Sequence, residues 1–161
     1  MNNPQSPNKL QILEFFIFNR YGICLLHLDF QNEQNTMTNR ALESDKEKNN
    51  ENRYKLMFGL LFSMKSFIKS ISPNKSVDYF KSFSTSNYKL HYAEFLNGLR
   101  FICLTTQIKG DLTSNLNEIF SAYYVNFVSK NFLINKDEPF KNELFIELTH
   151  NYLNNLNSTV N

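Results

Sequence analysis

Short apolar segments of strand length recur along the chain and are separated by polar turns. The turn Asn19–Arg20–Tyr21–Gly22 joins the first two, and Asn97–Gly98, a strong hairpin signal, joins the last two. We therefore expect five strands in two antiparallel groups. The strand-like segments are residues 10–18, 23–30, 77–84, 88–95 and 99–106.

Three longer segments place apolar residues three and four positions apart, which is typical of one face of a helix. Asp137, followed by Glu138–Pro139, is a suitable cap for the third. The order ββαβββαα predicts an α+β fold, in which one five-stranded antiparallel sheet carries one helix on one face and two on the other. The helical segments are residues 53–71, 112–132 and 137–156. The apolar positions of the second helix are Leu116, Ile119, Phe120, Tyr123 and Phe127, and those of the third are Phe140, Leu144, Leu148 and Tyr152.

Polar segments bound one expected domain, residues 10–157. Residues 1–9 form an Asn- and Pro-rich leader that we expect to be disordered, and residues 158–161 form a short tail. Residues 31–52 contain almost no large apolar side chains, so burial cannot offset the entropy cost of ordering them. We expect a flexible loop there.

Composition narrows the class of partner. A formal charge of +2 lies well below the basic footprint of a nucleic-acid-binding protein, so we expect no nucleic acid partner. Cys24 and Cys103 lie inside apolar strands, which favours buried free thiols and a reducing compartment. The longest strongly apolar run, residues 56–64, is far shorter than the roughly 18 to 20 residues of a membrane-spanning helix.

The residues needed for catalysis or cofactor binding do not form a recognisable pattern. The histidines His27, His91 and His150 share no spacing that would bind a metal, and neither CxxC nor HExxH occurs. There is no Gly-x-Ser-x-Gly motif, and the four glycines are isolated, so no phosphate-binding loop is expected. We expect no cofactor, no metal and no active site, and a small enzyme is the weakest alternative.

The first helix carries more apolar residues than one core face requires. Phe58 and Phe62 fall on the opposite side from the main apolar stripe, among Lys55, Lys65 and Lys69, which indicates a partner-binding surface. The alternative is that part of the C-terminal segment folds over the two phenylalanines. The lysines either steer an acidic partner or form an ordinary solvated face. The main stripe, which we assign to the core, is Leu56, Met57, Leu60, Leu61, Met64, Phe67, Ile68 and Ile71.

The segment 88–95 alternates between two faces. Tyr88, Leu90 and Tyr92 lie on one face, and this aromatic face is expected to pack under a helix. His91 lies on the other, mixed face with Lys89 and Ala93. A contact between His91 and another subunit is the less favoured interpretation of this strand.

Several segments resemble the TRAPP (trafficking protein particle) subunit 1 family, which is sybindin-like and longin-like. They occur in the order of that family and extend the resemblance from residue 12 to about residue 156. Phe30 stands where the family leads us to expect Trp, and residues 1–9 and 31–52 also depart from its pattern. The segments are FFIFNRYGICL, YKLMFGLLFSMKSFIKSISP, FSTSNYKLHYAEFLNGLRFI and IFSAYYVNFVSKN.

The resemblance implies a longin-like (SNARE-like) fold and a non-catalytic subunit of a vesicle-tethering complex. It also implies other TRAPP subunits and a Rab-type GTPase as partners, and a contribution to nucleotide exchange in transport between endoplasmic reticulum and Golgi. The implied location is cytoplasmic and peripheral at the cis-Golgi and endoplasmic reticulum, with membrane association only through the complex. The alternative is an independent longin module, either an adaptor or the regulatory domain of a SNARE.

Overall fold

A computed structural model of the chain describes residues 9–31, 43–73, 80–108 and 110–159. The order of its elements agrees with ββαβββαα, and the predicted α+β class is confirmed. The elements are β1 (Ile12–Phe18), β2 (Cys24–Asp29), α1 (Glu43–Ile71), β3 (Ser82–Ser84), β4 (Lys89–Glu94), β5 (Arg100–Thr105), α2 (Thr113–Glu118), the π-helix η3 (Ile119–Ser129) and α3 (Glu143–Thr159).

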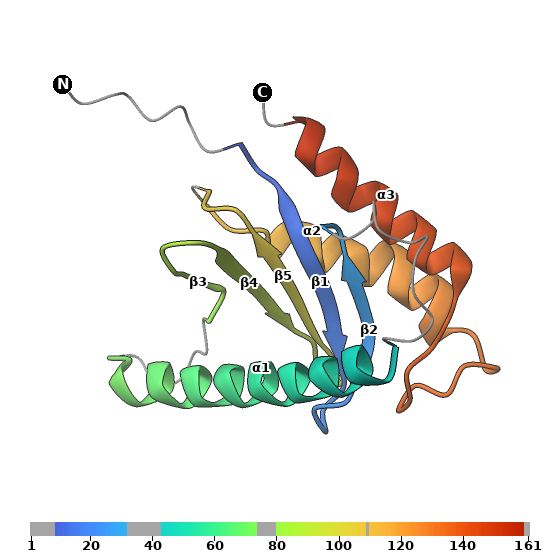
Figure 1. Ribbon diagram of the computed structural model, residues 1–161, viewed down its shortest axis with the longest axis horizontal. Coiled ribbons are helices and arrows are strands. Elements are labelled where there is room, and N and C mark those ends of the chain that lie inside the picture. Colours follow the sequence, from blue (N-terminus) through green and yellow to red (C-terminus); the bar gives the residue numbers. More distant parts are fainter. Residues whose placement is uncertain (1–8, 32–42, 74–79, 109, 160–161) are drawn as a thin grey trace.

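The five strands form one antiparallel sheet in the order β2-β1-β5-β4-β3. β1 and β5 lie in its interior and pair with one another, with Phe16 opposite Ile102. Figure 1 shows α1 on one side of the sheet and α2 and α3 on the other. The sheet is therefore the middle layer of three, as the sequence predicts.

Alternation along the strands supplies a separate core to each face of the sheet. Phe16 and Ile102 point toward α1 and pack with Leu61 of that helix. Their strand neighbours Phe15 and Phe101 point the other way and meet edge to face, 5.7 Å between ring centroids. This period of two explains why the interior strands are almost continuously apolar.

The helix α1 begins ten residues earlier than the sequence predicts, so the expectation of a flexible loop is wrong for residues 43–52. These residues are polar, but Glu and Lys are good helix formers, and extending a helix that is already packed costs little per residue. An exposed ion pair supports the extension, with Lys55 Nζ 2.9 Å from Glu51 Oε1. Residues 32–42 of the predicted loop lie outside the described residues, as do residues 1–8 of the leader.

The second helical segment forms where expected but winds differently. α2 continues directly into the π-helix η3, in which the Lys130 amide donates to the Val125 carbonyl five residues earlier, at 3.2 Å. Because of this wider winding, Ile119 and Tyr124 both reach the core although they are five positions apart. The α-helical spacing had predicted Tyr123 in place of Tyr124.

The third helix starts six residues later than predicted. Asn142 is its cap, because Asn142 Oδ1 accepts a hydrogen bond from the Phe145 amide at 2.9 Å, so the prediction of Asp137 as the cap is wrong. Phe140 is buried but precedes the helix, where its amide donates to the Leu25 carbonyl of β2. The buried positions of α3 are therefore Phe145, Thr149 and Leu153, and Leu144 is half-exposed. The helix also continues to Thr159, two residues into the predicted tail.

One predicted strand is shorter in the structure, and the two cysteines differ in burial. β3 is limited to Ser82–Ser84, and residues 77–79 of the predicted strand 77–84 lie outside the described residues. Cys24 and Cys103 are free thiols, as expected, but only Cys103 is fully buried, whereas Cys24 is partly buried. Burial raises the pKa of Cys24 to about 12 and raises that of Cys103 as well, so neither is an activated nucleophile.

Candidate protein-binding site

The apolar residues of α1 divide into a buried and an exposed group. Leu61 is buried in the core beside the sheet, with Tyr54, Met57, Phe58, Met64 and Ile68 partly buried around it. The prediction that the whole main stripe is core is wrong for four of its members. They are Leu56 (75% exposed), Leu60 (41%), Phe67 (58%) and Ile71 (64%).

These four residues, Leu56, Leu60, Phe67 and Ile71, form what we call the outer apolar strip. At about 100° per residue, they share an arc of roughly 60° whose centre lies roughly 110° from Leu61. The stripe seen in the sequence is therefore too broad for the sheet to cover, and only the half around Leu61 faces it. The other half is an exposed apolar surface on a helix, which is typical of a protein contact.

A groove extends the outer apolar strip toward the sheet. Its helix wall includes Leu56 and Leu60, and its sheet wall includes Leu13, Leu90 and Leu104. The groove has a volume of about 480 Å³. Two of the four strip residues, Leu56 and Leu60, thus line a concave surface that is mainly apolar, with Glu14, Arg53 and other polar groups in its lining. Such a surface is better suited to receiving side chains from another protein than a flat helix face.

Phe58 and Phe62 differ in exposure, although the sequence places them together. Phe58 is partly buried by this chain, since its ring lies 6.2 Å from that of Phe18 and the Arg100 guanidinium carbon lies 4.9 Å from its centroid. Gly22 makes this approach feasible: it has φ +86°, and a Cβ there would lie 2.8 Å from the Phe58 ring. The β1–β2 turn, not the C-terminal segment, covers Phe58. Phe62 remains 65% exposed.

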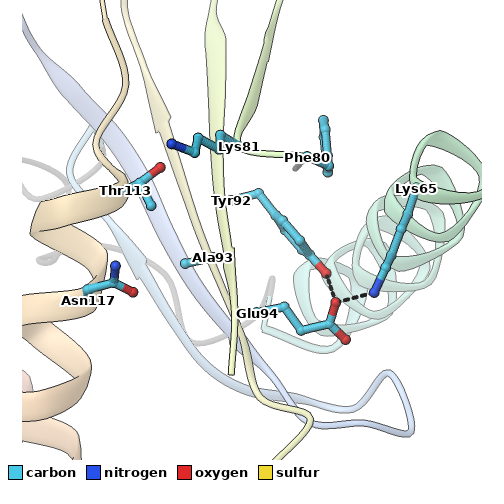
Figure 2. Close-up of a pocket in the computed structure, with 8 residues that line it drawn as sticks. All are labelled: Lys65, Phe80, Lys81, Tyr92, Ala93, Glu94, Thr113 and Asn117. Atoms are coloured by element: carbon cyan, nitrogen blue, oxygen red, sulfur yellow. Dashed lines mark hydrogen bonds and ion pairs between the residues drawn. The ribbon is translucent and has the colours of Figure 1, made fainter. Parts of the chain in front are cut away.

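A cluster of charges lies beside Phe62, and we call it the Glu94 network. Lys65 Nζ lies 2.5 Å from Glu94 Oε2, the Tyr92 hydroxyl donates to the same oxygen at 3.0 Å, and Arg100 Nη2 lies 3.2 Å from Glu94 Oε1. Figure 2 shows Lys65 of α1 and Tyr92 of β4 both reaching the carboxylate of Glu94. Burial raises the pKa of Glu94, but hydrogen bonds from Lys65 and Tyr92 outweigh burial, and the pKa lies below its ordinary value. The carboxylate stays ionised and holds α1 against the sheet.

Two hollows adjoin the Glu94 network. The smaller is lined by the two phenylalanines Phe58 and Phe62 with Leu61, Lys65, Tyr92 and Arg100. The larger, of about 230 Å³, passes around β4 from Lys65 to Thr113 and Asn117 at α2 (Figure 2). Two lysines, one side-chain amide, two hydroxyl-bearing residues and one paired carboxylate line it together with Phe80 and Ala93, a set that can both hydrogen-bond to and pack against a protein surface.

Glu14 is a structurally important residue that the sequence analysis missed. It is 7% exposed on β1, accepts from Arg53 Nη1 at 2.7 Å and lies 2.7 Å from His27 Nε2. Arg53 Nη2 makes a second contact with the carboxylate, and His27 Nδ1 lies 2.9 Å from the Tyr54 hydroxyl. The network joins α1 to β1 and β2. A carboxylate inside the apolar segment 10–18 was the available signal.

The other predicted site residues have different surroundings. Lys55 pairs with Glu51, Lys65 belongs to the Glu94 network, and Lys69 is exposed in the last turn of α1. His91 is fully buried, with Nε2 3.0 Å from Thr105 Oγ1 and Nδ1 accepting from the Leu112 amide at 3.1 Å. Burial lowers the pKa of His91 to about 4, so it stays neutral. With no exposed surface to offer a partner, His91 is a core residue and the prediction of a contact there is corrected.

Within the described ranges, no helix is both long and apolar enough to cross a bilayer. The part of the chain described by the structure also contains no group of three or more His, Cys, Asp or Glu residues placed to hold a metal ion. The features that stand out are surfaces: an apolar strip, a groove and a rim of paired charges.

The strand order and the three layers define a longin-like α+β protein whose prominent features are contact surfaces. A sequence profile of the Sybindin-like family matches residues 12–156, and the chain belongs to this family, as its resemblance predicts. It is 33% identical over 147 residues to Trafficking protein particle complex subunit 1 of Rattus norvegicus, covering 91% of this chain and 94% of the relative.

Similarity extends to distant organisms. The subunit 1 protein of Dictyostelium discoideum is 33% identical over 149 residues, which cover 91% of this chain and 97% of the relative. Trafficking protein particle complex subunit BET5 of Saccharomyces cerevisiae is 32% identical over 122 residues, covering 76% of this chain and 74% of the relative. The relatives therefore match most of the described fold.

Proposed function

We propose that this chain is a structural, non-catalytic subunit of a TRAPP-type vesicle-tethering complex, and that α1 carries its main contact surface. The outer apolar strip is the observation on which the proposal rests. Burying a large apolar side chain contributes about 1.5 to 3 kcal/mol, and exposed strips of this kind mark protein interfaces more often than solvent-facing helices. The relatives, whose names describe complex subunits, support the same role.

In the proposed complex, the outer apolar strip and its groove bind another TRAPP subunit. Leu56, Leu60 and Phe67 would form the centre of that interface, where apolar and aromatic side chains carry most of the binding energy. The polar N-terminal turns of α1 would lie at its rim. Size-exclusion chromatography with candidate partner subunits tests the proposal, and a chain that stays monomeric and binds none of them contradicts it.

The complex is proposed to promote nucleotide exchange on a Rab-type GTPase during transport between endoplasmic reticulum and Golgi, from the cytoplasmic side of those membranes. Exchange needs no covalent catalyst, because binding the nucleotide-free GTPase more tightly than the nucleotide-bound form shifts the population toward release. The side of α1 that carries Phe62, with Lys55 and Lys69 near it, is the surface assigned to the GTPase.

Phe62→Ala is expected to slow exchange by about tenfold without changing stability, since an exposed aromatic truncated in an interface costs at least about 1.4 kcal/mol. Phe58→Ala is the matched comparison. It should lower the free energy of unfolding by about 2 kcal/mol, because the ring packs on Phe18 and Arg100 within the chain. Release of a fluorescent nucleotide by the assembled complex and urea unfolding of each variant measure the two effects. If exchange proceeded at the normal rate with Phe62→Ala, Phe62 would not be part of the GTPase-binding surface.

The double variant Lys55→Gln/Lys69→Gln is expected to slow association with an acidic partner several-fold at low salt. The difference should vanish at high salt, because exposed charges act over about 10 Å at 0.1 M and less above it. Stopped-flow association rates over a salt series check this. Lys136→Gln/Lys141→Gln, which removes the same charge from two exposed residues outside α1, is the control, and an equal effect of that change would show that only net charge matters.

A further inference from the structure

The loop between η3 and α3 presents two adjacent apolar side chains to solvent. Phe132 is 94% exposed and Leu133 is 91% exposed, so neither is covered by the rest of the chain. Figure 1 shows this loop, in orange, projecting beyond the ends of η3 and α3. Side chains this large are costly to expose, and a pair of them on a projecting loop calls for an explanation.

Hydrogen bonds and packing give the loop a defined shape. The Leu133 amide donates to Asn131 Oδ1 at 3.0 Å, and the Asn131 amide donates to the Val128 carbonyl at 3.2 Å. Ile134, the next residue, turns inward and packs against the core. The backbone is thus anchored on both sides of the tip, and Phe132 and Leu133 are held outward.

Cations flank the tip. Lys130 and Lys136 are both exposed, and no acidic residue lies between them in the sequence KNFLINK. Asp137 and Glu138 follow at the base of the loop, where Asn19 Nδ2 donates to the Asp137 carbonyl at 3.4 Å. The charge at the tip is therefore positive, and the acidic pair lies where the chain returns to the body of the protein.

From this geometry we propose that residues 130–136 insert into the headgroup region of a bilayer that contains anionic lipids. Phe132 and Leu133 enter the apolar boundary, and Lys130 and Lys136 bind lipid phosphates beside them. A protein partner fits less well, since two adjacent side chains provide far less than the roughly 800 Å² per partner of a stable interface. The chain would then touch the membrane itself, whereas its family resemblance implies contact only through the complex.

A tryptophan reporter tests the insertion directly, because the chain contains no tryptophan. Phe132→Trp in the full chain should show a blue shift of its emission, and quenching by brominated lipid, with vesicles of phosphatidylcholine and phosphatidylserine. Vesicles of phosphatidylcholine alone should give a much smaller shift. Leu96→Trp is the matched control, since Leu96 is also fully exposed but lies on the β4–β5 turn without flanking lysines.

Two further variants separate the apolar and charged parts. Phe132→Ser/Leu133→Ser should pellet with anionic vesicles about tenfold less, and Lys130→Gln/Lys136→Gln about tenfold less at low salt only. Neither pair is buried, so the fold should persist, and circular dichroism checks it. Absence of a blue shift for Phe132→Trp, or an equal shift for Leu96→Trp, overturns the proposal. So does a serine variant that keeps its lipid binding but no longer joins partner subunits. The lipid tests need no partner subunit, so they fail or succeed independently of the proposed function.

Discussion

Leu60→Glu/Phe67→Glu is expected to abolish assembly with partner subunits while leaving the chain folded. The two residues are 41% and 58% exposed, so they contribute little to the core but lie in the middle of the outer apolar strip. Burying either one contributes about 1.5 kcal/mol or more, and an unpaired carboxylate in the same place adds a desolvation cost. Affinity should fall by at least about a hundredfold, since about 1.4 kcal/mol corresponds to tenfold.

Isothermal titration calorimetry with a purified partner subunit measures this loss, and urea unfolding shows whether the variant remains folded. Leu96→Glu is a suitable control, because Leu96 is exposed and apolar but lies on the β4–β5 turn, outside the outer apolar strip. If the double variant assembled normally, the outer apolar strip would not be the contact surface. An equal loss with Leu96→Glu would point instead to a general effect of added negative charge.

Glu14→Gln is expected to lower the free energy of unfolding by about 2 kcal/mol at neutral pH. Removing one partner of a buried ion pair costs about 3 to 5 kcal/mol. We expect the smaller loss of about 2 kcal/mol for Glu14→Gln, because the Arg53 side chain is 43% exposed and can be solvated again. Urea unfolding at pH 7 gives the difference. Glu51→Gln, which breaks an exposed pair with Lys55, is the control and should change stability by less than about 0.5 kcal/mol.

The contribution of Glu14 should also depend on pH. Burial raises the pKa of Glu14, but hydrogen bonds from His27 and Arg53 outweigh burial and hold the pKa below its ordinary value of 4.5. The stabilisation is therefore complete above the pKa of the unfolded chain and is lost as the pH falls through the lower pKa of the folded state. The gap between wild type and Glu14→Gln should be largest near pH 7 and shrink below about pH 4.5. A gap that stayed constant down to pH 3 would contradict the role of the ionised carboxylate.

The amino-acid pattern was sufficient for the strands but not for the faces of α1. Alternation along 88–95 correctly predicted that Tyr92 and Leu90 lie under a helix, because a strand has only two sides. A helix can pack against a sheet at any rotation about its own axis, so a broad apolar stripe does not reveal which half of the stripe faces the sheet. Leu56 and Phe67 were assigned to the core for that reason, whereas Leu61 was assigned correctly.

Tertiary contacts decided the residues that periodicity could not place. Phe58 is partly buried because Gly22 permits a close approach of the β1–β2 turn, a contact between positions far apart in the sequence. His91 is buried because the Thr105 hydroxyl and the Leu112 amide satisfy both ring nitrogens. The π-helical winding of η3 changed which aromatic residues reach the core. None of these follows from local spacing.

The length of α1 has a mechanical consequence. Its 29 residues extend about 44 Å at 1.5 Å per residue, whereas five strands span about 19 Å between the outer strand axes. Figure 1 shows the helix reaching past the sheet. The helix α1 is longer than the sheet is wide, and the Glu14 and Glu94 carboxylates fix it to the sheet. Helix and sheet therefore move as one rigid body. A small tilt of the sheet would therefore produce a larger displacement at the projecting end of α1. A protein bound to that end would be moved by this larger distance.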